Sequence, residues 1–369
     1  MKYFKMNRIN VIIVLFFYLF VFFIIAGCGE KQSKKISFSQ TDADGYWEMI
    51  GFGDTFHQRV FNQQGFLILN NSGDVITGEI TDFGVDSKIF TGGAVSITSR
   101  GSATGSIESF LDDTNEYLNY TVHDGQMTFN KDVIVYAGDF PVSNKGVGIL
   151  VKRSGTFTGF DLEGDWVFPL EGVFTVSVDH SGAVTGCSIL SDKGTSGICS
   201  GTLSITSEGV VSGQIKAVNG RAYQIKFNGR MDSGKNIMSF AGGLQGRFEG
   251  LATFAVKRDG TFSLSDGRGN WKIFVTDTQD TVYGTIMLED SGKISGGNWS
   301  TVRKGSGTFT GGTLLISQQG DVSGLINTSA GNTYTIIGGQ ASSAGDFIGG
   351  LLKDSSGIYR VMVLVKFPG

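Results

Sequence analysis

Three stretches of the chain repeat one phrase: "GGAVSITSRGSATGSI" at Gly92–Ile107, "SGTLSITSEGVVSGQI" at Ser200–Ile215 and "GGTLLISQQGDVSGLI" at Gly311–Ile326. Their starting positions lie 108 and 111 residues apart. This spacing is far longer than the roughly 20 to 50 residues of a solenoid or propeller-blade repeat. The chain is therefore predicted to carry three tandem copies of a unit the size of a small domain.

Other landmarks recur in the same order around each copy. A Gly-x-Trp opens every unit and an apolar run ending in lysine closes it; the pairs are Trp47 and Lys152, Trp166 and Lys257, and Trp271 and Lys366. The predicted organisation is a signal peptide at 1–27, a flexible tether at 28–44, and units at 45–158, 159–264 and 265–369. Because 40% of the 369 residues are hydrophobic and only 17% are charged, each unit is expected to fold around its own core.

Hydrophobic residues alternate with polar ones inside a unit, which indicates β-strands with one buried face. In the second unit Phe174, Val176 and Val178 show this alternation, and eight such runs lie near positions 166, 174, 184, 203, 211, 223, 240 and 254. Glycine-containing turns separate them. The predicted fold is all-β, with three tandem eight-stranded antiparallel up-and-down barrels, since closure removes both sheet edges. A six-bladed β-propeller made of the same 24 strands is the alternative.

The opening of each unit resembles the calycin group, which includes lipocalins and avidin-like barrels. The resemblance rests on "GDWVFPLEGVFTVSVDHSGAVTG" (Gly164–Gly186), on the Gly-x-Trp of the first strand, on the strand count and on a lysine in the last strand. It implies that the tryptophan plugs one end of the barrel and that the lysine lies over it. Each Trp–Lys pair is therefore expected to meet where its barrel closes. Apart from Trp299, the later tryptophans that wall the biotin site of avidins are missing, so no biotin-contact residue is assigned.

The first 28 residues resemble the signal peptide of a bacterial lipoprotein. Three basic residues precede an apolar run of sixteen at Val11–Ala26, which is shorter than the about 20 residues of a spanning helix. The run leads into "IAGC", which resembles a lipobox and implies acylation of Cys28 and anchoring by its acyl chains, such as palmitate. Gly29 stands where members retained at the inner membrane often carry aspartate, so the resemblance implies the outer membrane. An uncleaved anchor helix is the alternative.

Two further cysteines, Cys187 and Cys199, flank a short loop between strands that are expected to be adjacent. A lipoprotein body lies outside the cytoplasm, where disulfides persist, so these two residues are predicted to pair. Without the signal peptide the chain keeps 27 basic residues against 34 acidic ones, a net charge of −7. This balance leaves no basic stripe for phosphates and argues against nucleic acid as a partner.

The sequence contains no recognisable catalytic or metal-binding motif. Triads and zinc sites need histidine, and His57, His123 and His180 are far apart in turn-like contexts, so each is interpreted as a solvated loop residue. The cluster "DDTNE" (Asp112–Glu116) lacks the spacing and the glycine of a calcium loop and is interpreted as a hydrated hairpin. No enzyme activity, metal or cofactor is predicted.

These observations favour a lipid-anchored cell-envelope protein that binds without catalysis. The expected partner is a small apolar ligand or an envelope or extracellular protein, and repetition of the unit would provide avidity. A structural or adhesive envelope protein with filled barrels is the alternative.

Overall fold

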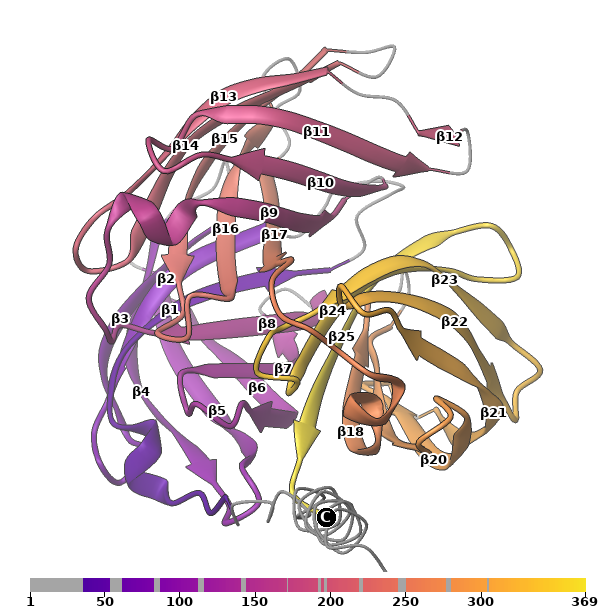
Figure 1. Ribbon diagram of the computed structural model, residues 1–369. Helices are drawn as coiled ribbons and strands as arrows, with labels where there is room; N and C mark the ends of the chain where they lie inside the picture. The colour runs from indigo at the N-terminus through magenta and orange to yellow at the C-terminus, as the bar shows by residue number, and fades with distance from the viewer. Residues whose placement is uncertain are drawn as a thin grey trace, which may run out of the picture. The chain divides into compact units, whose positions relative to one another are not determined.

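The computed structural model describes residues 36–53, 62–82, 87–111, 116–140, 144–170, 172–191, 194–195, 198–218, 222–244, 250–276, 280–303 and 305–369. From Ser37 to Gly369 the chain forms one compact unit. It consists of three consecutive copies of one arrangement, a 3-10 helix followed by an antiparallel β-meander (Figure 1).

The elements follow the repeats. The first copy contains η1 (Gln40–Ala43), β1 (Gly45–Phe52), β2 (Asn62–Leu69), β3 (Val75–Asp82), β4 (Ser87–Ile97), β5 (Ser102–Leu111), β6 (Glu116–Met127), β7 (Val133–Phe140) and β8 (Asn144–Lys152). The second contains η2 (Gly159–Leu162), β9 (Gly164–Pro169), β10 (Val173–Val178), β11 (Val184–Ser191), β12 (Gly194–Thr195), β13 (Ile198–Ile205), β14 (Val210–Val218), β15 (Ala222–Met231), β16 (Ile237–Leu244) and β17 (Gly250–Lys257). The third contains η3 (Leu264–Gly267), β18 (Gly269–Val275), β19 (Val282–Leu288), β20 (Ile294–Thr301), β21 (Ser306–Ile316), β22 (Asp321–Thr328), β23 (Thr333–Ala341), β24 (Phe347–Lys353) and β25 (Tyr359–Phe367).

The first and third meanders close into eight-stranded barrels, because β1 pairs with β8 and β18 pairs with β25. In the second copy β9 likewise pairs with β17, and the strands run in one nine-stranded sheet from β12 to β13 that includes the two-residue β12. The predicted all-β fold of three barrels is confirmed. The propeller alternative is wrong, because each unit pairs its own first and last strands.

The second barrel has a weak seam between β11 and β13. In the first barrel the equivalent strands β3 and β4 form four register pairs from Gly78↔Phe90 to Thr81↔Ser87, and the third barrel keeps three between β20 and β21. Among the described residues the second barrel shows only the isolated bridge Ala183↔Thr202 at this place. The wall of this barrel is therefore incomplete in backbone pairing.

The three barrels share a core in addition to their own interiors. The shared cluster draws buried apolar residues from β1, β7 and β8, from β9, β16 and β17, and from β18, β24 and β25. Phe254 lies at its centre, with ring centroids 6.2 Å from Phe52 and 5.8 Å from Phe347. A Cβ at Gly349 would come within 2.1 Å of the Phe254 ring, so the glycine makes room for it.

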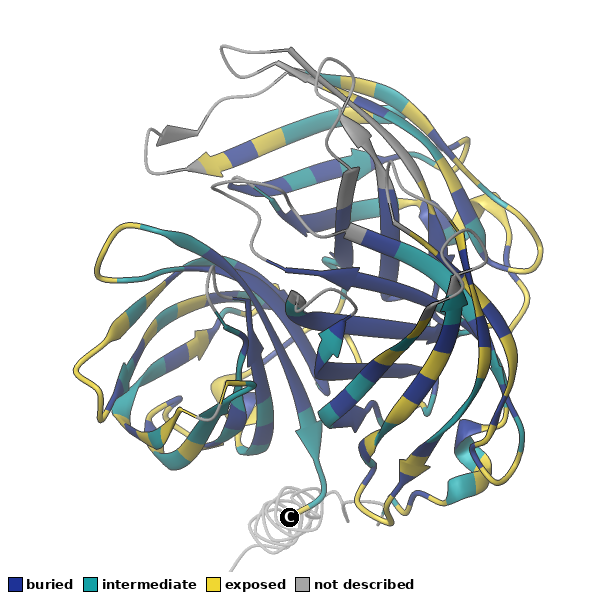
Figure 2. Cartoon of the chain, turned by 180° about the vertical axis from the view of Figure 1, so that it is seen from behind, coloured by how far each residue is buried: buried dark blue, intermediate teal, exposed yellow. Residues whose placement is uncertain are grey.

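Burial on both faces distinguishes the strands of this shared core. In Figure 2 they appear as almost continuous dark blue, whereas the outer strands alternate in colour. Strand β25, for example, has six consecutive buried residues, and β7 begins with six. The expectation that each unit folds around its own core therefore covers only part of the buried surface.

Part of the segment predicted as a flexible tether is folded. Phe38 is buried, and the side-chain amide of Gln40 donates to the carbonyl of Val95 and accepts from the amide of Ile97. The helix η1 that follows covers the end of the first barrel. The prediction of a tether extending to residue 44 is wrong for these residues. Composition alone could not show that Phe38 would be buried and that Gln40 would bond to the barrel.

Candidate functional site

Each barrel is sealed at one end by its tryptophan and lysine. The register pairs Trp47 with Lys152, Trp166 with Lys257 and Trp271 with Lys366, and the ammonium groups lie 5.4, 5.6 and 5.3 Å from the ring centroids. The three tryptophans are completely buried. The structure thus brings together every predicted Trp–Lys pair, at distances typical of cation–π contacts.

The preceding 3-10 helix completes each seal. The indole N–H groups donate to the carbonyls of Ala43, Leu162 and Gly267 over 2.7 to 2.8 Å. The lysine ammoniums donate to the carbonyls one residue earlier, over 2.9 to 3.2 Å. Burial is the largest influence on the pKa of Lys152 and Lys366, and it lowers both. The tryptophan, the lysine and the 3-10 helix thus close this end of each barrel with hydrogen bonds. A ligand would therefore have to enter elsewhere.

The glycine of each Gly-x-Trp is required by this seal. Gly45, Gly164 and Gly269 have φ values of 127°, 124° and 127°, which L-residues rarely adopt. A Cβ there would lie 3.0 to 3.1 Å from the lysine side chain. The motif is therefore explained by structure and needs no catalytic role.

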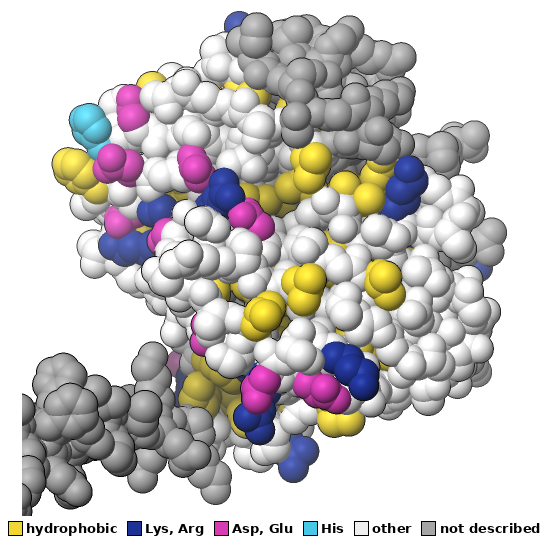
Figure 3. Space-filling view, turned by 45° about the vertical axis from the view of Figure 1, so that its right-hand side comes forward, with side chains coloured by type: hydrophobic (Ala, Val, Ile, Leu, Met, Phe, Trp, Pro, Cys, Tyr) yellow, Lys and Arg dark blue, Asp and Glu magenta, His cyan; other side chains and the backbone are white. Residues whose placement is uncertain are grey.

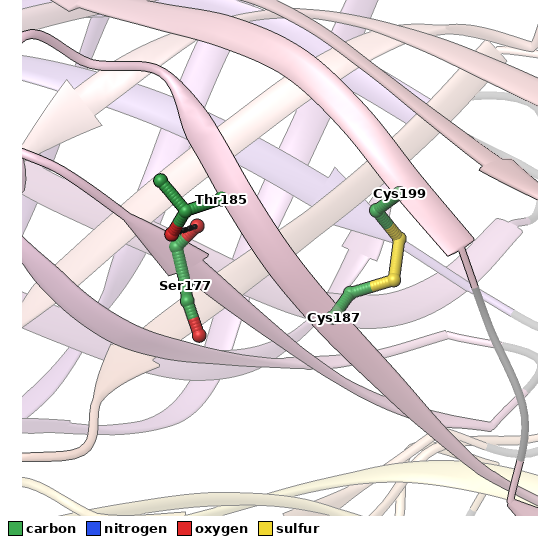
Figure 4. The surroundings of a disulfide bond; sticks show 4 residues. All are labelled: Ser177, Thr185, Cys187 and Cys199. Atoms are coloured by element: carbon green, nitrogen blue, oxygen red, sulfur yellow. Dashed lines mark hydrogen bonds between the residues drawn. A yellow bond between two sulfur atoms is a disulfide. The ribbon is translucent and has the colours of Figure 1, made fainter.

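A disulfide between Cys187 and Cys199 joins β11 to β13 across the weak seam of the second barrel. Figure 4 shows this bond on one side of β11, while on the other side the Thr185 hydroxyl donates to the carbonyl of Ser177 on β10. Both cysteines are only partly buried against the core of this barrel. The disulfide therefore closes the wall where the ladder of hydrogen bonds is missing.

The interior of the first barrel contains a buried glutamine. Gln63 lies on β2, on the same face as Leu67 and Leu69, and is fully buried. Among the described residues, neither its side-chain nitrogen nor its side-chain oxygen has a hydrogen-bond partner. It pairs in register with Gly51, and the Phe140 ring covers that glycine. This residue was not predicted from the sequence, where its only signal is a glutamine at an apolar position of the period-two pattern.

Aromatic rings and a lysine line the same interior. Tyr120 packs edge-on against Phe90 and Phe140, with centroid distances of 5.5 and 6.1 Å. Lys88 on β4 is 3% exposed and faces inward like Phe90. The first barrel therefore combines polar groups with aromatic walls.

The third barrel is filled at the equivalent positions. Val282 is equivalent to Gln63 of the first barrel. Each lies four residues before the residue that pairs with the sealing tryptophan, Leu67 in the first barrel and Ile286 in the third. Gly307 stands where the first barrel has Lys88, and the Trp299 ring occupies the space above it, since a Cβ at this glycine would lie 2.7 Å from the ring. The repeats thus keep the sealed end and diverge toward the opposite end.

The remaining predicted residues are placed as follows. His123 lies on β6 with its Nε2 2.7 Å from a carboxylate oxygen of Asp139 on β7, so its prediction as a solvated loop residue is wrong. His180 is exposed in the turn after β10 and stacks on Phe160 at 5.7 Å. Cys28, His57 and most of the "DDTNE" cluster lie outside the described residues.

No group of three or more His, Cys, Asp or Glu side chains in the described part of the chain is arranged to hold a metal ion. None of the helices described is long and apolar enough to cross a membrane.

Comparisons with known proteins give distant structural matches only. No family model matches the chain, and no curated protein matches it. Transferrin binding protein B from Haemophilus parasuis Hp5 is similar at 11% identity over 87% of this chain and 75% of that chain, with a TM-score of 0.27. The isotype 1 protein of that name from serogroup B Neisseria meningitidis has 9% identity over 88% and 76%, with a TM-score of 0.25. Kievitone hydratase from Nectria haematococca has 11% identity over 91% and 94%, with a TM-score of 0.21. At these scores the matches establish no family.

Proposed function

We propose that this protein is a lipid-anchored binding protein of the cell envelope, without catalytic activity, that holds a rigid three-barrel body away from the membrane. The observation that carries the proposal is the shared core, because it joins the barrels into one body. Such a body presents its surfaces in constant relative positions, which lowers the entropic cost of binding a large partner. The lipobox-like "IAGC" and the polar segment after it supply the anchor and the tether.

The outer surface favours a polar contact with an envelope or extracellular protein. On the face that Figure 3 shows, apolar and charged side chains are scattered among other side chains and backbone. The exposed large apolar residues also come from all three barrels, as with Ile76, Leu190 and Leu315. Exposed apolar residues that lie singly do not form a contiguous hydrophobic patch for docking. The same proposal places the anchored body at the outer membrane.

A small-molecule role is favoured by one observation in the first barrel. A fully buried amide without a partner costs free energy, and a bound molecule with polar and apolar parts would satisfy Gln63 and contact the aromatic walls. The alternative of a structural or adhesive protein is favoured by the third barrel, where Trp299 covers Gly307 and packs against the barrel core.

The anchor is tested by labelling cells with palmitate. Wild-type protein should carry the label and sediment with membranes, and Cys28→Ser should lose both properties. The double variant Cys187→Ser, Cys199→Ser is the matched control, since it keeps Cys28 and should keep the label. Membrane retention of Cys28→Ser equal to that of wild type would contradict the lipoprotein assignment.

Binding is tested separately, on the body released from its own cells. Native mass spectrometry should show either a bound small molecule or a crosslinked envelope protein. A bound molecule that disappears in Gln63→Leu assigns the first barrel as its site. If every preparation shows only the mass of the protein itself, the structural alternative is supported.

A further inference from the structure

The three barrels meet at three equivalent turns, which precede β7, β16 and β24. They span Thr128–Val133, Asp232–Ile237 and Ser342–Phe347. In each turn the fourth amide donates to the first carbonyl, over 2.8 to 3.0 Å. The side-chain oxygen of the first residue accepts from the sixth amide, over 3.3, 2.7 and 3.3 Å. The turns are therefore three copies of one structure, although threonine, aspartate and serine hold the first position.

Hydrogen bonds connect these turns into a closed ring. The second residue of each turn donates to the side chain of the fifth residue in another barrel. The Ser233 amide donates to Asp132 over 3.0 Å, the Ser343 hydroxyl donates to Asn236 over 2.8 Å, and the Phe129 amide donates to Asp346 over 2.7 Å. Barrel two thus contacts barrel one, three contacts two, and one contacts three. The ring has approximate threefold symmetry because every link uses the same donor and acceptor positions.

The ring encloses three carboxyl groups away from water. Asp132, Asp232 and Asp346 are each 2% exposed. In the second turn the acid occupies the first position and Asn236 the fifth, whereas the other turns carry the acid at the fifth. Burial together with the charges of Asp132 and Asp346 raises the pKa of Asp232 to about 8, and burial raises the pKa of Asp346 as well.

Cations near the ring are held by other acceptors. Within the described part of the chain, the charged side chains near the ring, besides its three acids, are Lys131, Lys152, Lys235, Lys257, Asp259 and Lys366, together with Asp42, Asp44, Asp161 and Asp266 beside these lysines. Lys131 and Lys235 form ion pairs with Asp42 and Asp161 at the 3-10 helices, each at 2.9 Å. Lys152, Lys257 and Lys366 donate to carbonyls of those helices. The charges of Asp132 and Asp346 act on Lys152 and Lys366, respectively, against the effect of burial on the pKa of these lysines. The pKa of Asp232, in contrast, is set by burial, by the other two acids and by backbone amides, so this is the acid that keeps a proton.

We propose that this ring of turns is a proton-dependent clamp that locks the three barrels into one body at neutral pH and loosens when the proton is lost in alkaline solution. A proton on Asp232 leaves at most two negative charges among the three acids. Its release adds a third charge in the same dry volume and weakens the links between barrels. This role does not depend on the proposed function, because it concerns how the body is held together.

The sign follows from proton linkage. An aspartate with a raised pKa binds its proton more tightly in the folded state than in the unfolded state, where its pKa is about 3.9. Its contribution to stability is complete below the unfolded value and is lost as the pH rises toward the folded value. Wild-type stability should therefore decline across the window from about pH 4 to pH 8 because of this group.

The test is urea unfolding of the full body, wild type and Asp232→Asn, between pH 5 and pH 9. Asparagine keeps the oxygen that accepts from the amides of Asn236 and Ile237, and its NH2 replaces the protonated oxygen. Between pH 5 and about pH 8 the wild-type unfolding constant should rise about tenfold per pH unit relative to the variant, the signature of one proton. Parallel pH dependences would overturn the proposal.

A matched control and a second readout separate the clamp from general stability. Asp179 precedes a turn of the same barrel, is half-buried and also accepts from two backbone amides, so Asp179→Asn should keep the wild-type pH dependence between pH 5 and pH 9. Infrared spectroscopy at pH 7 should show a protonated carboxyl band that is missing in Asp232→Asn.

Hydrogen exchange at pH 9 should show the amides of Phe129 and Ser233 opening before the barrel interiors. Opening of these amides only with global unfolding, or a carboxyl band of undiminished intensity in Asp232→Asn, would also refute the clamp.

Discussion

Replacing Gln63 with leucine should stabilise the isolated protein, although it removes a polar residue that the first barrel has buried completely. Neither polar atom of this side chain has a partner among the described residues, so folding removes the amide from water without compensation. Leucine has nearly the same volume and suits the aromatic surroundings. The third repeat already carries an apolar residue, Val282, at this position.

The expected magnitude follows from the cost of burying an amide. Mutational data place that cost at about 1 to 3 kcal/mol for a group without a hydrogen bond. A near-isosteric exchange adds little cavity cost. The free energy of unfolding of Gln63→Leu should therefore exceed that of wild type by about 1 to 3 kcal/mol.

Gln126, in the same barrel, is the matched control. It is equally buried, and its side-chain oxygen also has no partner among the described residues. Its side-chain nitrogen, unlike that of Gln63, donates to the carbonyls of Arg100 and Met127 over 2.9 and 3.1 Å. Gln126→Leu leaves both carbonyls without this donor, so it should destabilise the protein by about 1 to 3 kcal/mol. The two substitutions are chemically identical and should have opposite signs.

Urea unfolding followed by circular dichroism, on protein stripped of bound molecules by refolding, measures both variants. A loss of stability in Gln63→Leu would refute the reasoning, because it would mean that the amide has a partner in the folded protein. If a ligand is that partner, adding it back should stabilise wild type and leave Gln63→Leu unchanged.

Three further predictions concern the barrels. The bond between Cys187 and Cys199 joins residues 12 positions apart, so its loss in the double serine variant should cost up to about 3 kcal/mol. An unfolding midpoint that does not change with reductant would contradict this. Trp166→Ala should cost about 3 to 5 kcal/mol as a core truncation, whereas Lys257→Met should cost at most about 2 kcal/mol; equal losses would argue against the tryptophan as the main plug. A fragment of residues 159–264 exposes its part of the shared core and should aggregate in gel filtration, whereas a soluble monomer with a cooperative transition would show that the second barrel needs no neighbour.

The sequence alone was sufficient for the plan of each barrel. Period-two alternation and glycine turns determine strands locally, and closure of the meander, which the calycin-like landmarks implied, brings the last strand back to the first. The pairing of Trp166 with Lys257 could therefore be predicted although the residues lie 91 positions apart. The disulfide followed in the same way, because a short loop between adjacent strands brings its two flanks together.

The arrangement of the barrels was decided only by the tertiary structure. Apolar residues on both faces of β7 and β25 are visible in the sequence as "VIVYAG" and "VMVLVK", but they do not say which surface covers them. The links of the turn ring join residues 101 to 217 positions apart and depend on how the barrels dock. Local pattern carries no information about such contacts, since it records burial and not the identity of the neighbour. The absence of a described partner for Gln63 and the carboxylate beside His123 belong to the same class, because each depends on side chains from other strands.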